Sequence, residues 1–185
     1  MVDPISGAAI GAVVLTEGIK FLYSQATELL RRWRESRASA ATQPTPEPIL
    51  RPPANLIEGS VEPAKPDYGH LERLQPELQE LRRGLADYAD DLQEVDPNDP
   101  LLWEQVDALR RMLEVIYGQH ITFKGEQREA SGPLVQARLS VDKVLGDAAA
   151  VRVKIMERGR IIAEAEADEV GPGARLTAAE LDEMR

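Results

Sequence analysis

The chain has 185 residues, of which 43% are apolar and 29% charged, and a formal net charge of −10. That length suffices for one domain or two small ones with a modest core. The acidic balance argues against general nucleic-acid binding, which needs a basic surface to neutralise phosphates. The chain has no cysteine, which excludes disulfides and thiolate metal sites and is compatible with a reducing cytoplasm.

The charge is unevenly distributed along the chain. Residues 1–37 carry five basic and four acidic side chains, whereas residues 68–120 carry five basic and twelve acidic ones. The basic concentration lies at the end of the first predicted helix, around Trp33. The first charged residue is the acidic Asp3 and no basic region precedes the apolar run, so the N-terminus does not resemble a secretory signal.

Residues 1–37 predict a long apolar helix with a basic C-terminal end. Asp3 and Pro4 suit the N-cap and the first helical position. One stripe recurs at spacings of three and four and contains Ala8, Ala12, Leu15, Ile19, Leu22, Ala26, Leu29 and Trp33. The run from Ile5 to Leu15 spans only about 17 Å, against roughly 30 Å of membrane hydrocarbon.

Two interpretations of this helix remain open. In the first, the run is a core helix that the rest of the domain covers. In the second, it inserts conditionally into a bilayer or an oligomer, since Gly7 and Gly11 form a GxxxG pattern that permits close backbone approach. The expected membrane or oligomer contacts are Ile5, Gly7, Ile10, Gly11, Val13, Val14, Leu15 and Trp33. The expected lipid-headgroup contacts are Arg31, Arg32, Arg34 and Arg37.

Residues 38–67 predict a spacer, because they contain seven of the thirteen prolines. Leu56 and Ile57 are expected to pin this spacer to a domain surface.

Residues 68–119 predict an antiparallel helical hairpin, which completes a three-helix bundle with a coiled-coil-like seam. The first arm carries Leu71, Leu74, Leu78, Leu81, Leu85, Tyr88, Leu92 and Val95 at spacings of three and four. Pro76 predicts that its regular helix starts there. Asp99 and Pro100 predict the cap and first residue of the second arm, which ends at Gly118.

Residues 120–185 predict a β domain, because the apolar period changes to two. An antiparallel hairpin with its loop at 158–160 would place Lys154 opposite Glu164 and Arg152 opposite Glu166. A capping box at Thr177 predicts a helical end to the chain. Residues 137–148 and 163–174 share four identities at an offset of 26. An α+β fold is expected, with either a small antiparallel sheet or a short β-solenoid after the helices.

No catalytic, cofactor-binding or metal-binding residues are assigned. His70 and His120 lack partners at a metal-ligand spacing, and no nucleophile or phosphate-loop motif occurs. We therefore expect a protein that is not an enzyme.

The opening from Asp3 to Leu15, an acidic residue and a proline followed by small apolar residues, resembles the start of HeLo-like (Bell-type) domains of fungi and multicellular bacteria. The resemblance implies a membrane-disrupting cell-death domain whose first helix inserts. In several members a C-terminal β-solenoid with two pseudo-repeats controls triggering. This chain departs from that pattern in its charged alternation and its lack of Asn-rich segments.

Two functions follow as expectations. One is a membrane-associating or self-assembling immunity effector in the cytoplasm, whose partners are further copies of itself and the inner face of an anionic membrane. The other is a cytoplasmic structural or adaptor subunit that oligomerises through its helix seam and sheet.

Overall fold

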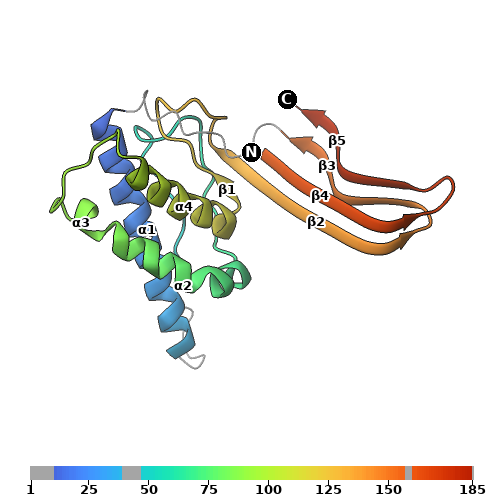
Figure 1. The fold of residues 1–185 in the computed structure, drawn as a ribbon, viewed down its shortest axis with the longest axis horizontal. Helices are drawn as coiled ribbons and strands as arrows, with labels where there is room; N and C mark the ends of the chain where they lie inside the picture. The colour runs from blue at the N-terminus through green and yellow to red at the C-terminus, as the bar shows by residue number, and fades with distance from the viewer. Residues whose placement is uncertain (1–10, 39–46, 157–159, 185) are drawn as a thin grey trace.

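The computed structural model describes residues 11–38, 47–156 and 160–184, and consists of a helical part from which a β arm extends (Figure 1). The helical part contains α1 (Ala12–Ala38), α2 (Tyr68–Gly84), α3 (Ala86–Ala89) and α4 (Pro100–Tyr117). The arm contains β2 (Gly132–Val144), β3 (Asp147–Met156), β4 (Arg160–Val170) and β5 (Arg175–Met184). Between the two parts lies the short strand β1 (Gln119–His120). A mixed helix and sheet fold is thus confirmed.

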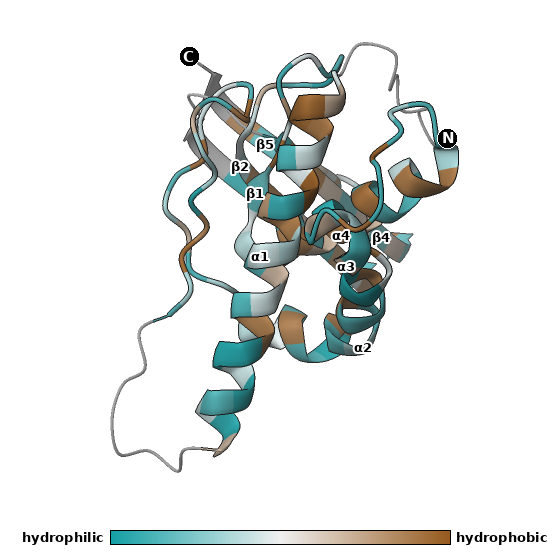
Figure 2. Ribbon diagram, turned by 90° about the vertical axis from the view of Figure 1, so that its left-hand side faces the viewer, coloured by the Kyte–Doolittle hydropathy of each residue, from teal (hydrophilic) through white to brown (hydrophobic). Residues whose placement is uncertain are grey.

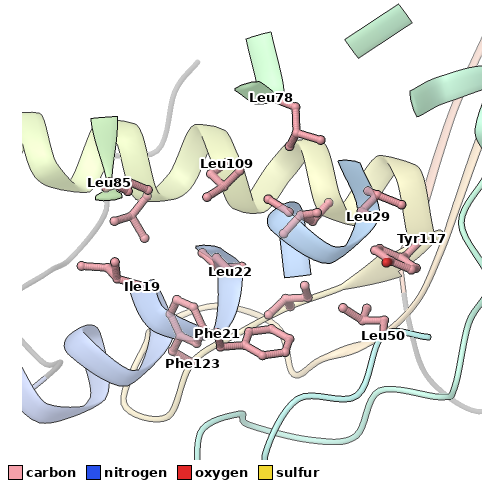
Figure 3. Packing of buried hydrophobic residues seen from close by; sticks show 14 of the residues in the cluster. Ile19, Phe21, Leu22, Leu29, Leu50, Leu78, Leu85, Leu109, Tyr117 and Phe123 are labelled. Carbon is pink, nitrogen blue, oxygen red and sulfur yellow. The ribbon is translucent and has the colours of Figure 1, made fainter. Parts of the chain in front are cut away.

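The apolar stripe of α1 forms the centre of the helical core (Figure 3). Leu15, Ile19, Leu22, Ala26 and Leu29 are fully buried. Figure 2 shows α1 changing from mostly hydrophobic near its N-terminal end to mostly hydrophilic at its C-terminal end. The expected cap at Asp3 and the residues up to Ile10 lie outside the described part of the chain.

The proline-rich segment packs on the helices over residues 47–67. Leu50, Leu56 and Ile57 are buried in the same core as α1, so Leu56 and Ile57 do attach the segment to the domain. The backbone of Glu58 donates to Thr122 O at 2.8 Å and accepts from Ser131 N at 2.8 Å. This stretch therefore forms a wall of the helical part.

The prediction that the second helix starts at Pro76 was wrong. α2 begins at Tyr68, and the Asp67 side chain caps it by accepting from Gly69 N and His70 N. Pro76 lies inside the helix. The cap and the burial of Leu71 and Leu78 outweigh the one backbone hydrogen bond that proline cannot donate.

The hairpin seam ends earlier than the periodicity predicts. Leu92 is 77% exposed, because α3 ends at Ala89 and Asp91 takes a positive φ of 58° that terminates the helical path. The start and end of α4 agree with the prediction. Asp99 caps it through Leu101 N, Pro100 is its first residue, and Gly118 adopts the left-handed conformation with φ 61°.

The expected antiparallel pairing was wrong for the strands of the arm. β2 pairs with β4 in parallel, and β3 pairs with β5 in parallel. The turns at 145–146 and 171–174 carry the chain from one sheet to the other. Each pair of strands with its turn, β2 with β3 and β4 with β5, forms an arch, and the two arches stack. Stacking brings the apolar faces of both sheets together, whereas flat hairpins would leave one face uncovered.

The sequence repeat at an offset of 26 residues matches the register of the sheet formed by β2 and β4. Ala137 pairs with Ala163, and Val144 pairs with Val170. The sheet of β3 and β5 has an offset of 28 residues, as in Asp147 with Arg175. The offset is larger because the turn at 171–174 is two residues longer than the turn at 145–146. The identical residues Ala148 and Ala174 are therefore not paired.

Two further expectations for this region were wrong. Arg152 does not face Glu166 but pairs with Glu180, and β4 lies beside β2 rather than beside β3, so Lys154 does not face Glu164. The predicted terminal helix is strand β5, since parallel pairing with β3 supplies the hydrogen bonds that a short isolated helix lacks.

Close packing at Gly18 gives a test of the core. A Cβ there would lie 2.8 Å from the Phe123 ring, which is fully buried and cannot move aside. Gly18→Ala should lower the free energy of unfolding by about 1–3 kcal/mol, measured by urea denaturation.

Gly84→Ala is the matched control, because its Cβ would meet only the flexible amide end of Gln105. That change should be neutral or stabilise by up to about 1 kcal/mol. Equal losses from both substitutions would contradict the packing.

Candidate functional site

The structure divides the predicted membrane or oligomer contacts into three groups. Ile5, Gly7 and Ile10 lie outside the described residues. Leu15 is fully buried, while Val14 and Trp33 are partly buried against the core. Gly11 and Val13 are exposed: Val13 by 76%, and a Cβ at Gly11 would meet no atom within 4 Å. Of the described contacts, only these last two face open space.

The arginine cluster is paired with acidic neighbours. Arg31 and Arg32 bind Glu28 at 2.7 Å, and Arg31 also binds Glu35 at 2.8 Å. Hydrogen bonds from these arginines lower the pKa of the Glu28 carboxyl. Contact with lipid headgroups would compete with these pairs.

The other two arginines of the cluster are also engaged. Arg34 donates to Leu30 O at 3.2 Å. Arg37 binds Glu72 at 3.1 Å, and its guanidinium lies 5.2 Å from the centroid of the Trp33 ring. All four predicted headgroup residues thus have partners within the chain.

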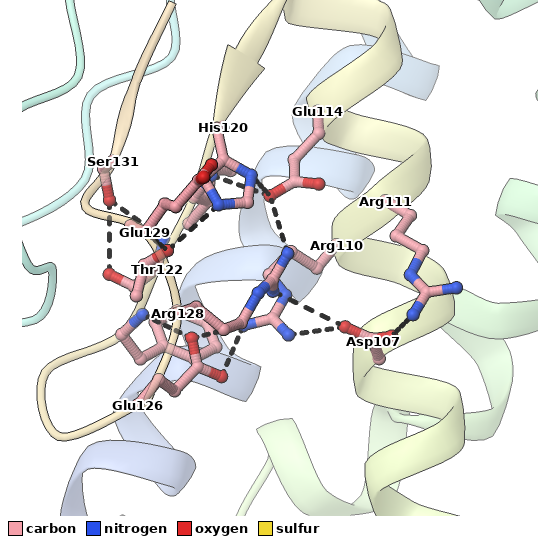
Figure 4. A network of polar contacts seen from close by, with 12 residues as sticks. Asp107, Arg110, Arg111, Glu114, His120, Thr122, Glu126, Arg128, Glu129 and Ser131 are labelled. Carbon is pink, nitrogen blue, oxygen red and sulfur yellow. Dashed lines mark hydrogen bonds and ion pairs between the residues drawn. The ribbon is translucent and has the colours of Figure 1, made fainter. Parts of the chain in front are cut away.

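A buried polar network at the base of the arm was not predicted (Figure 4). At its centre, the fully buried Arg110 binds Asp107 at 2.5 Å and Glu126 at 2.6 Å. Its guanidinium also lies 5.3 Å from the Phe123 ring centroid. Glu126 in turn accepts from Phe123 N at 2.9 Å. Arg110 therefore joins α4 to the loop that leads into the arm.

A second branch of the network holds β1. Glu114 accepts from Ile121 N at 2.7 Å and contacts His120 Nδ1 at 3.0 Å. Thr122 N donates to Ser131 Oγ at 2.9 Å, and Thr122 Oγ1 donates to Glu129 O at 2.6 Å. These bonds fix the segment between α4 and β2.

Burial and neighbouring charge act in opposite directions at Arg110. Burial alone would lower the pKa of its guanidinium, but Glu126 and Asp107 hold that pKa above its ordinary value. At Arg128, burial and the charge of Arg110 lower the pKa. The charges of the carboxylates and guanidiniums balance one another, which is typical of a structural ion network rather than of a site poised for proton transfer.

One sequence signal for this network exists. Trp103, Arg110 and Tyr117 recur every seven residues, so the arginine shares a face of α4 with two aromatic residues. All three are buried.

A cleft of about 240 Å³ lies beside the network, between the start of α2, the end of α4 and the start of β2. Its polar lining includes Lys65, Asp67, His70 and Glu114. His70 Nδ1 lies 3.2 Å from Asp67 Oδ2, an oxygen of the same carboxylate that caps α2. No group of three His, Asp or Glu side chains suited to a metal ion occurs in the described ranges.

The arm is held together by ion pairs between its stacked strands. Arg138 Nε donates to Glu164 at 2.8 Å, and Lys143 donates to Glu169 at 2.7 Å. Arg152 binds Glu180 at 2.8 Å in the second sheet.

The outer edges of the arm are open. Among the described strands, β4, β3 and β5 each have a single neighbour. The outer edge of β2 pairs with β1 only at Gly132 and Pro133. Unpaired backbone donors and acceptors along a strand edge favour the addition of another strand.

Comparisons with protein-family models, curated proteins and solved structures matched nothing. Every helix in the described ranges is too short or too polar to cross a bilayer.

The network predicts very different effects for two adjacent arginines. Arg110→Ala removes the cation bound to the buried carboxylate of Glu126 and one of the cations bound to Asp107, and should lower the free energy of unfolding by about 3–5 kcal/mol. Arg111→Ala removes a cation that is 56% exposed, though also bound to Asp107, and should cost about 1 kcal/mol or less. Chemical denaturation of both variants checks this, and similar losses would argue against a buried network.

Proposed function

We propose that the chain is a non-enzymatic protein that assembles with further copies of itself through the β arm. The observation that carries this proposal is the pair of stacked parallel arches with open outer edges. Edges of this kind are normally covered, shortened or blocked in proteins that remain monomeric.

The incomplete burial of the arm supports the proposal. Val135, Ala137, Leu139 and Val141 point to the inner side of β2 but are only half-buried. In a stacked repeat, each unit covers the apolar face of its neighbour, and terminal units need a polar cap. Here both units are terminal, and a further unit would bury apolar surface that now meets water.

The helical part supplies a stable folded body next to the arm. Its core contains the α1 stripe, and the Arg110 network fixes the arm's first strand to it. The expected cytoplasmic location and immunity role remain predictions.

Blocking the outer strand gives the principal test. Ala165 is half-buried on the inner side of β4, and a lysine there places a charge where an added strand would pack. Wild-type protein should elute as a multimer by size-exclusion light scattering, and Ala165→Lys should be mostly monomeric.

Leu92→Lys is the control, since Leu92 is exposed on the helical part; it should assemble as the wild type does. A wild-type protein that stays monomeric at about 100 μM would refute the proposal, since specific assemblies usually bind more tightly than this.

Membrane association by the first helix is a second candidate. The exposed Val13 and the open surface at Gly11 favour it, because they extend the apolar end of α1 beyond the core. The paired arginines weaken the headgroup part of that hypothesis.

Dye release from anionic vesicles tests this second function. Wild-type protein should release dye, and Gly11→Glu should abolish release while preserving the fold. Gly146→Glu is the matched control, because a Cβ at Gly146 would also meet no atom within 4 Å. Equal release by both variants would exclude a role for this end of the helix.

A further inference from the structure

The two stacked units of the arm carry opposite charge. We define the first rung as residues 132–156 and the second rung as residues 160–184. The first rung contains four basic and two acidic side chains, and the second contains two basic and seven acidic ones. In each of the three ion pairs between the rungs that the described side chains form, the base belongs to the first rung and the acid to the second.

This asymmetry gives the arm a direction. We propose that a second copy docks head to tail, with its second rung against the first rung of its neighbour. The inference rests on the self-assembly proposed above and specifies which edges meet. If the register within one copy continues into the next, Glu164 of one copy lies opposite Arg138 of the other. The opposite-charge pairs that join the rungs within one copy, Arg138 with Glu164, Lys143 with Glu169 and Arg152 with Glu180, would then recur between copies, where each is attractive.

The base of the arm leaves room for this contact. β1 pairs with β2 at Gly132 and Pro133, and Leu134 N donates to Gly118 O at 2.8 Å, so the outer edge of β2 is engaged as far as Leu134. Within one copy, β4 begins at Arg160, which pairs with Leu134. A second rung docked in the same register would therefore overlap the engaged part of β2 only at its first residue and would occupy the edge from Val135 onward.

A symmetric arrangement is unfavourable. A two-fold axis would pair β4 with β4 of the other copy in antiparallel orientation. The exposed side of β4 carries Glu164, Glu166 and Asp168 at alternate positions. Carboxylates would then face carboxylates, and like charges opposite one another destabilise a strand pair.

A charge-swapped variant tests the direction of docking. It combines Arg138→Glu and Arg152→Glu in the first rung with Glu164→Arg and Glu180→Arg in the second. Two ion pairs within the copy are kept with their charges reversed and the pair of Lys143 with Glu169 is unchanged, so the arm should fold as in the wild type. In head-to-tail docking, the variant should assemble with itself. In a contact between the variant and the wild type, positions 138 and 164, and positions 152 and 180, would carry like charges.

Co-expression of the two full-length chains with different affinity tags provides the measurement. Sequential pull-down should recover mixed assemblies roughly tenfold less often than same-chain assemblies, as expected for two pairs changed from attraction to repulsion. Raising the salt from about 0.05 M to about 0.5 M should reduce this discrimination, because screening shortens the reach of exposed charges.

The other outcomes are distinct. Preferential recovery of mixed assemblies would overturn the head-to-tail arrangement, since symmetric docking brings the acidic second rung of the wild type against the two arginines that Glu164→Arg and Glu180→Arg introduce in the variant. Random mixing, or discrimination that persists at high salt, would overturn a charge-directed contact. A wild-type chain that recovers no copies of itself would instead refute the self-assembly on which the inference rests.

Discussion

Arg110 is a fully buried cation whose charge is balanced by carboxylates from two parts of the chain, Asp107 on α4 and Glu126 on the following loop. Such a cation is costly unless both partners stay in place. Glu126 also holds the backbone of Phe123, and the Phe123 ring fills the space next to Gly18 on α1. The position of the first helix and the starting point of the arm therefore depend on the same ion pairs.

The helices could be read from the sequence because their signals are local. The stripe of α1, the cap at Asp99 and the glycine at Gly118 each depend on residues within one or two turns. The prediction was wrong at Pro76, because packing between α2 and α4 offsets the backbone hydrogen bond that proline cannot donate. That packing involves residues far apart in the sequence, so no local pattern indicates it. Leu92 continued the periodicity after the backbone had already turned at Asp91.

The arm was harder to predict, because alternating apolar residues suit parallel and antiparallel strands equally. Only the sequence repeat at an offset of 26 residues distinguished parallel from antiparallel pairing. The turn at 171–174 is two residues longer than the turn at 145–146, so the repeat no longer matches the register after Val144. The candidate contacts show a similar limit. The sequence revealed the cations of the arginine cluster, but Glu72, which binds Arg37, comes from another helix. The buried role of Arg110 likewise depends on a loop that folds back onto α4.

The thickness of the arm has a geometric consequence for any stack. Each added copy advances a stack by two strand spacings, about 10 Å. The helical part contains α1, α2 and α4 packed against one another, and two helices side by side already occupy about 20 Å. Neighbouring helical parts therefore cannot lie directly above one another. They must spread around the stack, and crowding would set how many copies one stack can hold before adjacent helical parts collide.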